Sequence, residues 1–266
     1  MRYSLMTEPQ LGGTYDDLLR FARHAETLGL VSFARSDHLA WRGAPMPATD
    51  AFATLGALAR ETETIRLCVL VTPITFRHPA IIAKNAATID QMSGGRLDLG
   101  VGTGWNEHEH DVLGLDFPGQ TERWRRFEDS LGYLTAAFSE PSTEHRGPYY
   151  SLATDVLPKP SGIRIVIGGS GPKRTPTFAG RYADEYNTYI GDPKGISTRV
   201  SVMREAAGDR QVEVTAMGSV ETGSRARLSE QILSLEEAGV ERVYLQWLDL
   251  TDFAGMAAMV DEVLSL

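Results

Sequence analysis

Short β-rich apolar runs alternate with longer amphipathic stretches along most of the chain. This periodicity predicts strands that alternate with helices. The predicted strands cover residues 2–6, 31–35, 65–71, 97–101, 163–167, 185–190, 212–217 and 243–247. Several of them are apolar at nearly every position, as is typical of parallel strands covered on both faces. Residues 163–167 are the exception, because Arg164 lies inside that run.

Helical periodicity fills the intervals between these runs. Thr14 is a suitable N-cap for the first helix, and Gly29 supplies its C-terminal stop. The apolar face of that helix is formed by Leu18, Phe21, Ala22, Ala25 and Leu28. Further helices are predicted over residues 51–60, 79–92, 121–138, 172–182, 193–207, 224–238 and 252–264. Pro79, Pro172 and Pro193 suit a first helical turn, where the missing amide donor is not needed.

Eight strands that are each followed by a helix match a (β/α)8 barrel of the TIM type, which belongs to the α/β class. Such barrels have about 250 residues, so we predict a single domain over residues 1–266. A doubly wound open sheet is the alternative, because alternation alone does not show closure. The longest irregular stretch covers residues 139–162, and its segment 146–150 can form a small hairpin. Loops of this length are often lids or binding loops, although some only cover the surface.

Charge and cysteine content narrow the possible partners and the compartment. The formal net charge of −9 argues against a non-specific nucleic-acid binder, which needs a basic surface. Cys68 is the one cysteine, so a reducing compartment is the simpler interpretation. We find no signal peptide, and no run approaches the roughly 18 apolar residues of a membrane span. We therefore expect a cytoplasmic protein that binds neither nucleic acid nor membranes.

The carboxyl ends of the strands are where a barrel carries its chemistry. After the second strand, Asp37 can accept hydrogen bonds, His38 can move a proton near neutral pH, and Trp41 can pack on a planar ring. The alternative is a loop-capping Asp, a structural His and a Trp that closes the end of the barrel. These residues alone favour that structural alternative.

Two glycine-rich segments follow the fourth and fifth strands. Gly102-Thr103-Gly104 lets the backbone approach a flat ligand, although a tight turn explains the pattern equally well. Gly168-Gly169-Ser170-Gly171 precedes a predicted helix, whose N-terminus and neighbouring amides can hold phosphate. Lys173 and Arg174 add positive charge there. This second segment is the better phosphate-site candidate, and it lacks the ending of a Walker loop.

Metal and nucleophile chemistry receive little support from the sequence. His108 and His110 flank Glu109, but residues two apart do not share a helix face. Glu107, Glu109 and Asp111 are interpreted as a solvated helix start. We find no metal-binding motif and no nucleophile elbow, so no metal is expected.

Taken together, these segments resemble the luciferase-like monooxygenase superfamily up to about residue 190. The resemblance is carried by SDH at residues 36–38, by IRLCVLVTPITFRHPAIIAKNAATIDQMSGGRLDLGVGTGW at residues 65–105 and by IGGSGP at residues 167–172. GLDFP at residues 114–118 and RYADEYN at residues 181–187 also fit. Within the superfamily, the chain is most similar to the coenzyme F420-dependent oxidoreductases, and other members use FMN.

The resemblance implies positions for the cofactor. Asp37 matches a residue that lies beside the deazaflavin in the F420 group. A non-prolyl cis peptide behind the ring is expected near Val69-Leu70, with Thr72 just beyond it. The Gly102-Thr103-Gly104 and Gly168-Gly169-Ser170-Gly171 segments match the family's tail- and phosphate-binding loops.

One departure concerns the acid that sugar-phosphate dehydrogenases of the family carry after GTG. Trp105 occupies that place here, and the next acid is Glu107. A sugar-phosphate substrate is therefore not expected. His38 is the first candidate for proton transfer and Glu107 the second, while Trp41 and Trp105 wall the substrate side.

The sequence thus predicts an F420-dependent oxidoreductase that transfers hydride between the deazaflavin and a small organic molecule. One alternative is an FMN-dependent monooxygenase that uses dioxygen. Another is a non-catalytic protein that binds flavin or deazaflavin. Many relatives form homodimers, and nothing in this sequence identifies such an interface.

Overall fold

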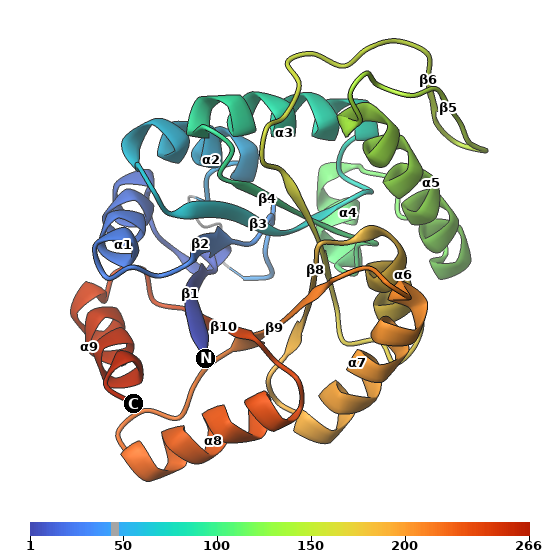
Figure 1. The fold of residues 1–266 in the computed structure, drawn as a ribbon. Helices are drawn as coiled ribbons and strands as arrows, with labels where there is room; N and C mark the ends of the chain where they lie inside the picture. Colours follow the sequence, from blue (N-terminus) through green and yellow to red (C-terminus); the bar gives the residue numbers. More distant parts are fainter. Residues whose placement is uncertain (44–47) are drawn as a thin grey trace.

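Within residues 1–43 and 48–266, which the computed structural model describes, eight parallel strands form a closed barrel with helices around its outside (Figure 1). The strands follow one another around the barrel in the order β1-β10-β9-β8-β7-β4-β3-β2. Closure confirms the predicted (β/α)8 barrel and excludes the open doubly wound sheet.

All the predicted strands are present, and their ends differ from the prediction by no more than two residues. They are β1 (Arg2–Thr7), β2 (Ser32–Arg35), β3 (Arg66–Pro73), β4 (Leu97–Gly102), β7 (Arg164–Gly168), β8 (Glu185–Tyr189), β9 (Glu213–Gly218) and β10 (Arg242–Trp247). Hydrophobic side chains on their outer faces form the main core with the surrounding helices.

The helices also lie where periodicity places them, except for α4, of which only a helix start was expected. They are α1 (Tyr15–Thr27), α2 (Ala51–Glu61), α3 (Pro79–Ser93), α4 (Glu107–Leu113), α5 (Gln120–Phe138), α6 (Arg174–Tyr182), α7 (Pro193–Ala207), α8 (Arg225–Glu237) and α9 (Phe253–Leu264). Thr14 caps α1 in a reciprocal capping box with Asp17, and Gly29 follows that helix with a left-handed φ of 72°. The prediction for Pro172 was wrong, because the chain stays non-helical through Lys173 and α6 begins only at Arg174.

The long segment before β7 contains the expected hairpin. Strands β5 (His145–Arg146) and β6 (Ser151–Leu152) pair antiparallel. The buried Asp129 of α5 holds this hairpin, because its carboxylate accepts hydrogen bonds from the Tyr149 and Tyr150 amides at 2.7 and 2.8 Å. The segment is therefore anchored to α5 by a carboxylate that has lost most of its contact with water.

The interior of the barrel is layered along its axis. Its middle layer is apolar and consists of Met6, Ala34, Cys68, Leu70, Val166, Met217 and Tyr244. This layer separates two polar ends of the barrel, and its Tyr244 hydroxyl bonds to Glu185 at one of them.

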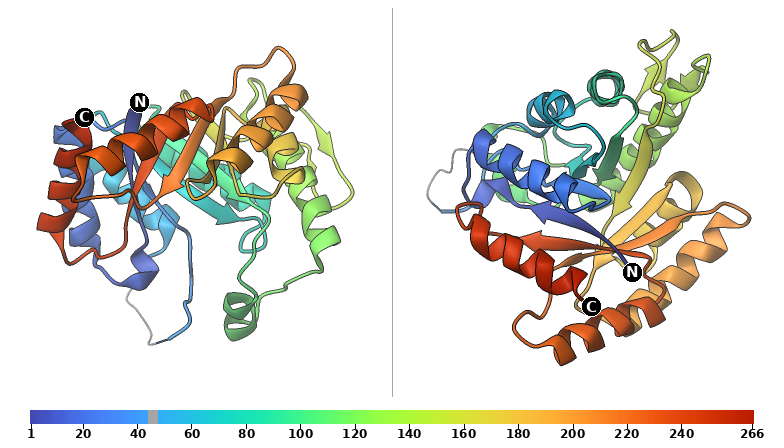
Figure 2. Two further views of the ribbon diagram at one scale, coloured as in Figure 1. Left: turned by 90° about the horizontal axis from the view of Figure 1, so that it is seen from below. Right: turned by 60° about the vertical axis from the view of Figure 1, so that its left-hand side comes forward.

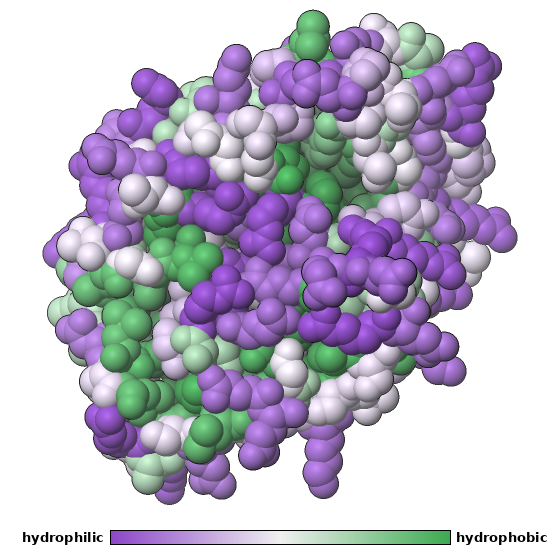
Figure 3. Space-filling model, in the orientation of Figure 1, coloured by the Kyte–Doolittle hydropathy of each residue, from purple (hydrophilic) through white to green (hydrophobic). Residues whose placement is uncertain are grey.

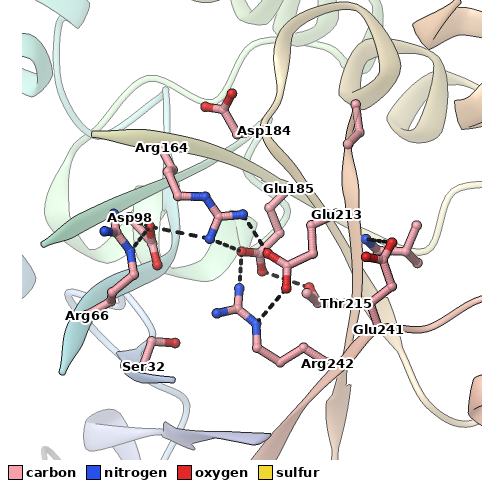
Figure 4. A network of polar contacts seen from close by, with 12 residues as sticks. Ser32, Arg66, Asp98, Arg164, Asp184, Glu185, Glu213, Thr215, Glu241 and Arg242 are labelled. Carbon is pink, nitrogen blue, oxygen red and sulfur yellow. Dashed lines mark hydrogen bonds and ion pairs between the residues drawn. The ribbon is translucent and has the colours of Figure 1, made fainter. Parts of the chain in front are cut away.

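The layer at the amino ends of the strands is a network of buried ions (Figure 4). Glu185 and Arg242 are both fully buried and form a charged hydrogen bond. Tyr244 and Thr215 also donate to Glu185, at 2.9 and 2.8 Å. Burial alone would lower the pKa of Arg242, but Tyr244 and the carboxylates of Glu185 and Glu213 raise it above its ordinary value.

Hydrophilic side chains gather over this same end of the barrel in the space-filling view (Figure 3). They surround a cavity of ≈ 520 Å³ in which cationic and anionic side chains are mixed, lined by Arg2, Arg164, Asp184, Arg204, Gln211, Val212, Glu213 and Glu241. Enzymes with this fold carry their active sites at the carboxyl ends of the strands, and the amino-terminal end serves stability. We therefore look for the active site at the opposite end.

At the carboxyl ends of the strands, α4 and the chain that follows β2 project together from the barrel (Figure 2). These two projections form the rim on which the predicted functional residues lie. None of the helices in the described part of the chain is long and apolar enough to cross a membrane.

Candidate active site at the carboxyl ends of the strands

The predicted proton-transfer residue His38 has a carboxylate partner that the sequence did not indicate. His38 Nδ1 lies 2.8 Å from Glu109 Oε2. The other Glu109 oxygen accepts hydrogen bonds from the Leu39 and Ala40 amides at 2.8 and 3.1 Å, and Asn106 Nδ2 donates to Oε2 at 2.9 Å. Glu109 is 1% exposed, so a buried, fully bonded carboxylate fixes both the imidazole and its loop.

This arrangement determines which imidazole nitrogen is available for chemistry. A carboxylate at Nδ1 favours the tautomer with hydrogen on that atom and leaves the lone pair on Nε2. Among the described residues, His38 Nε2 has no hydrogen-bond partner and is not sealed from solvent. His38 is therefore oriented to accept a proton at Nε2.

The charge of Glu109 is maintained by its surroundings. Burial would raise the pKa of Glu109, but the hydrogen bond and charge of His38, with the Ala40 and Leu39 amides, lower that pKa below its ordinary value. A carboxylate with a lowered pKa stabilises the fold above its unfolded pKa, and the stabilisation is lost as the pH falls through the folded value. Acidification should therefore release the loop that carries His38.

An aromatic cluster surrounds the imidazole. The Trp41 ring lies edge-on to His38 with centroids 4.8 Å apart, and Trp105 lies 5.9 Å from His38 and 6.1 Å from Trp41. A cavity of ≈ 280 Å³ opens beside this cluster and is lined by Gln10, His38, Leu39, Ala40, Trp41, Gly43, Ala48, His108 and Val112. The structure thus brings together His38, Trp41 and Trp105 as the sequence predicts.

Glu107, the second predicted proton-transfer residue, lies elsewhere. It is exposed at the first position of α4, and no side-chain hydrogen bond joins it to His38. The interpretation of the α4 acids as solvated was wrong for Glu109, which points inward while Glu107 and Asp111 are exposed. Of these acids, Glu109 is the one placed to act on the imidazole.

The predicted cofactor residue Asp37 is also buried, and it forms an ion pair. Arg77 Nη1 donates to Asp37 Oδ2 at 2.5 Å, and Arg77 Nη2 donates to Asp50 Oδ2 at 2.5 Å. Arg77 Nη1 also lies 3.3 Å from the hydroxyl of Thr72, another predicted cofactor residue. Burial would lower the pKa of Arg77, but Asp37 and Asp50 raise it. Arg77 therefore connects the ends of β2 and β3 into one charged patch.

A second set of side chains that the sequence did not indicate crosses the ends of β1, β2 and β10. Glu8 accepts hydrogen bonds from Gln10 Nε2 at 2.7 Å and from Gln246 Nε2 at 2.8 Å. Ser36 Oγ donates to Gln10 Oε1 at 2.6 Å. Glu8 is nearly buried, so this series of hydrogen bonds places a carboxylate directly behind the Gln10 side of the cavity.

Strand β3 carries the irregularity that the resemblance predicts, displaced by one residue. The cis peptide joins Leu70 to Val71 rather than Val69 to Leu70, and the register with β4 shifts between Val69 and Thr72. The bulge turns Val71 toward the neighbouring strands β4 and β7.

Two of the predicted cofactor glycines make room for this bulge. A Cβ atom built on Gly102 would lie 2.9 Å from Val71 Cγ2, and one on Gly168 would lie 2.9 Å from Val71 Cγ1. Gly100 is on the same strand as Gly102, and a Cβ atom built on it would lie 2.1 Å from the carbonyl oxygen of Val69. The absence of side chains here is a packing requirement of β3, whatever ligand the rim binds.

The two glycine-rich loops themselves lie at the rim. Gly104 has a φ of 80°, and Thr103 next to it is half-buried. Gly169 has a φ of 147°, and its carbonyl accepts a hydrogen bond from the Tyr186 hydroxyl at 3.1 Å. These left-handed φ values favour glycine, because an added Cβ is strained there.

The groups around the second loop suit an anionic ligand. Ser170 is exposed and Gly171 half-buried, ahead of the α6 amides. In the described part of the chain, the nearly buried Thr188 Oγ1 on β8 and Arg199 Nε on α7 have no hydrogen-bond partner. Unsatisfied buried polar groups are costly, and a bound ligand is one way to satisfy them. The donor set therefore fits the phosphate of a flavin-type cofactor.

Replacing Glu109 with glutamine tests its action on His38. Glutamine keeps the size of the side chain but loses the charge that favours hydrogen on Nδ1, so kcat/KM should fall by at least about tenfold. The pH dependence of kcat/KM should also change, and Glu109→Asp should restore part of the activity. Glu107→Gln is the matched comparison on the same helix, and we expect it to change little. A larger loss for Glu107→Gln than for Glu109→Gln would reverse the assignment.

The chain is similar to a known family and to several curated relatives. The family described as luciferase-like monooxygenase matches residues 1–239. An F420-dependent glucose-6-phosphate dehydrogenase from Microbacterium testaceum is 37% identical over 184 residues, which is 67% of this chain and 54% of that protein. An FMNH(2)-dependent dimethylsulfone monooxygenase from Pseudomonas fluorescens is 30% identical over 152 residues, which is 57% of this chain and 42% of that protein. The chain thus spans about half the length of the curated relatives it matches.

Solved structures show the same fold at low sequence identity. An F420-dependent secondary alcohol dehydrogenase in complex with an F420-acetone adduct superposes with a TM-score of 0.86 and 19% identity, covering 98% of this chain and 97% of that one. A long-chain alkane monooxygenase superposes with a TM-score of 0.83 and 14% identity, covering 100% and 90%. At such identities the likeness establishes the barrel and its arrangement of helices.

Proposed function

The chain belongs to the luciferase-like monooxygenase family, and from that premise we propose that it is an F420-dependent oxidoreductase acting on a small organic molecule. The observation that carries the proposal is the His38–Glu109 pair, because His38 lines a cavity at the rim of the barrel and its Nε2 atom has no partner among the described residues. Two curated relatives that are named as F420-dependent glucose-6-phosphate dehydrogenases support the choice of cofactor.

The residues that would hold the cofactor form two groups. Leu70, Val71 and Thr72 on β3 would support the ring, with Asp37 held beside them by Arg77. The Gly102–Gly104 and Gly168–Gly171 loops would take the tail and its phosphate. When bound, the deazaflavin supplies the carbon that accepts or donates hydride, and the protein supplies position and electrostatics.

The chain's own contribution to the reaction is proton transfer. As hydride leaves the carbon of an alcohol, its hydroxyl proton would pass to His38 Nε2. The imidazole then carries a positive charge, which the Glu109 carboxylate 2.8 Å from Nδ1 stabilises. In the reverse direction, His38 would return the proton to the carbonyl oxygen. Trp41 and Trp105 would limit the access of water to this step.

An FMN-dependent monooxygenase is the second candidate, and the relative from Pseudomonas fluorescens favours it. Such an enzyme consumes dioxygen when it is supplied with reduced FMN. Because free reduced FMN itself reacts with dioxygen, the discriminating measurement is whether an oxygenated product forms from the substrate, and a dehydrogenase should form none. The buried position of the single Cys68 suits a reducing compartment, so we propose that the protein acts in the cytoplasm.

Titration of the purified protein with coenzyme F420 and, separately, with FMN tests the choice of cofactor. We expect saturable F420 binding, measured by quenching of the coenzyme's fluorescence. A Gly168→Val variant should weaken this binding, because the new side chain would meet Val71 at the bulge. Gly119→Val is the matched control, since Gly119 has an ordinary φ of −56° and an added Cβ there would meet nothing within 4 Å. Tight FMN binding with no affinity for F420 would overturn the assignment.

A further inference from the structure

The cavity beside His38 is small and mostly apolar. Its volume of ≈ 280 Å³ lies just below the range of about 300–1,000 Å³ for small-molecule sites. Apart from the two imidazoles and the amide of Gln10, the described lining side chains are hydrocarbon or indole. Leu39 and Val112 are 40% and 55% exposed at its edge, so apolar surface is available to a ligand there.

Cations are missing from the described lining of this cavity. Phosphate recognition normally uses arginine or lysine, whose donors match the phosphate oxygens. Arg77 is already paired with Asp37 and Asp50. Arg35 is buried and bonded to Thr49 and Thr54. Both guanidinium groups are thus engaged, and the exposed Arg42, between Trp41 and Gly43, is not among the lining residues.

Carboxylates instead lie directly behind two sides of the cavity. Glu109 bonds to His38 on one side, and Glu8 bonds to Gln10 on the other. Both are nearly buried, so water screens their negative field poorly. A dianionic ligand would lose its hydration and meet like charge, which strongly disfavours its binding.

Trp105 supplies the positive part of the argument. Its side chain is 69% exposed, although it touches the rings of His38 and Trp41 by its edge. Together with the exposed Leu39 and Val112 at the edge of the cavity, this indole provides apolar surface that a ligand can cover. Covering it with the apolar body of a ligand removes hydrocarbon from water, which is favourable.

We propose that the substrate of this site is a small uncharged alcohol, or the corresponding carbonyl compound, with an apolar body. The inference rests on the proposed function and specifies its substrate class. In the oxidation, the carbon–hydrogen bond breaks and its hydride passes to the deazaflavin, while the hydroxyl proton passes to His38 Nε2 and the carbon–oxygen double bond forms. The alcohol loses two electrons and the deazaflavin gains them, so no further reactant is needed. A sugar phosphate does not meet these requirements.

Binding without turnover tests the substrate class independently of the cofactor chemistry. Cyclohexanone and glucose 6-phosphate serve as probes in calorimetric titrations of the full chain. We expect cyclohexanone to bind with at least about tenfold higher affinity than glucose 6-phosphate. Trp105→Ala should weaken cyclohexanone binding several-fold. Preferential binding of glucose 6-phosphate, or no binding of cyclohexanone, would overturn the inference.

A charge variant sharpens the test. Val112→Lys places an ammonium group at the edge of the cavity, so it should weaken cyclohexanone binding and raise the affinity for glucose 6-phosphate. Leu233→Lys on α8 is the matched control, because Leu233 is 56% exposed and is not among the cavity residues. Identical responses of the two variants would contradict the assigned cavity.

Turnover then separates failure of the inference from failure of the proposed function. Reduction of F420 by cyclohexanol but not by glucose 6-phosphate supports both. Reduction by glucose 6-phosphate alone overturns the substrate class and leaves the dehydrogenase assignment intact. Cyclohexanone binding with no F420 affinity overturns the dehydrogenase assignment and leaves the cavity chemistry intact.

Discussion

Replacing His38 with alanine is expected to lower kcat/KM by about 10²–10⁴-fold, the usual contribution of a positioned general acid or base. The reason is that Nε2 of His38 is held toward the cavity by the 2.8 Å contact between Nδ1 and Glu109. Alanine removes the proton acceptor and leaves the buried Glu109 with one partner fewer. Steady-state kinetics with F420 and cyclohexanol would measure the loss.

The affinity for F420 should change little in the same variant, because His38 is placed on the substrate side of the site. His145→Ala is the matched control, since His145 also pairs with a buried carboxylate, that of Asp129 at 2.8 Å, but is not among the described cavity residues. We expect near-normal kcat/KM for that control. An active His38→Ala enzyme would show that proton transfer occurs elsewhere and would favour a protein that only binds the cofactor.

Replacing Arg242 with alanine is expected to lower the free energy of unfolding by about 3–5 kcal/mol, the usual cost of removing one partner of a buried ion pair. Arg242 is completely buried, and its loss would leave the equally buried Glu185 with only the more distant Arg164, at 3.6 Å, as a cationic partner. It also contacts Glu213 at 3.2 Å, so two carboxylates would lose a partner. Urea denaturation followed by circular dichroism measures the difference.

Arg2→Ala provides the control for this effect. Arg2 also pairs with Glu213, at 2.9 Å, but its side chain is 55% exposed. Exposed pairs contribute about 0–1 kcal/mol, because water and salt screen them. Equal effects of the two substitutions would contradict the view that burial makes the charged layer essential to the barrel.

Much of the fold could be predicted because each element carries its own local signal. The apolar run at β3 and the N-cap residue Thr14 of α1 can be recognised without any tertiary information. Closure of the barrel could not be predicted from alternation, because an open sheet produces the same pattern. The start of α6 was missed because proline is compatible with a first helical turn, whereas Pro172 in fact precedes the N-cap residue Lys173.

The candidate site was only partly predictable, for a different physical reason. His38 and Trp41 lie three residues apart and could be recognised together in the sequence. Glu109 reaches His38 from 71 residues away, and its orientation depends on which face of α4 packs inward. The neighbouring His110 was a weak signal of that face, because it is also buried. Charge alone made Glu109 indistinguishable from the exposed Glu107.

The ion pair of Asp37 was missed in a similar way. Its partner Arg77 lies 40 residues further along the chain, in a segment that the resemblance covers without assigning a role to that residue. The glycines show the opposite case, since Gly102 and Gly168 were recognised as unusual. Their packing against the bulge at Val71 needed coordinates to be seen.

A crystal structure of the protein soaked with coenzyme F420 tests the central claim most directly. The account predicts that the deazaflavin ring lies against Leu70 and Val71 and that the phosphate lies at Gly168–Gly171, with His38 Nε2 facing the open side of the ring. An empty rim at saturating coenzyme, or a ring bound away from His38, would contradict the proposal while leaving the barrel unchanged.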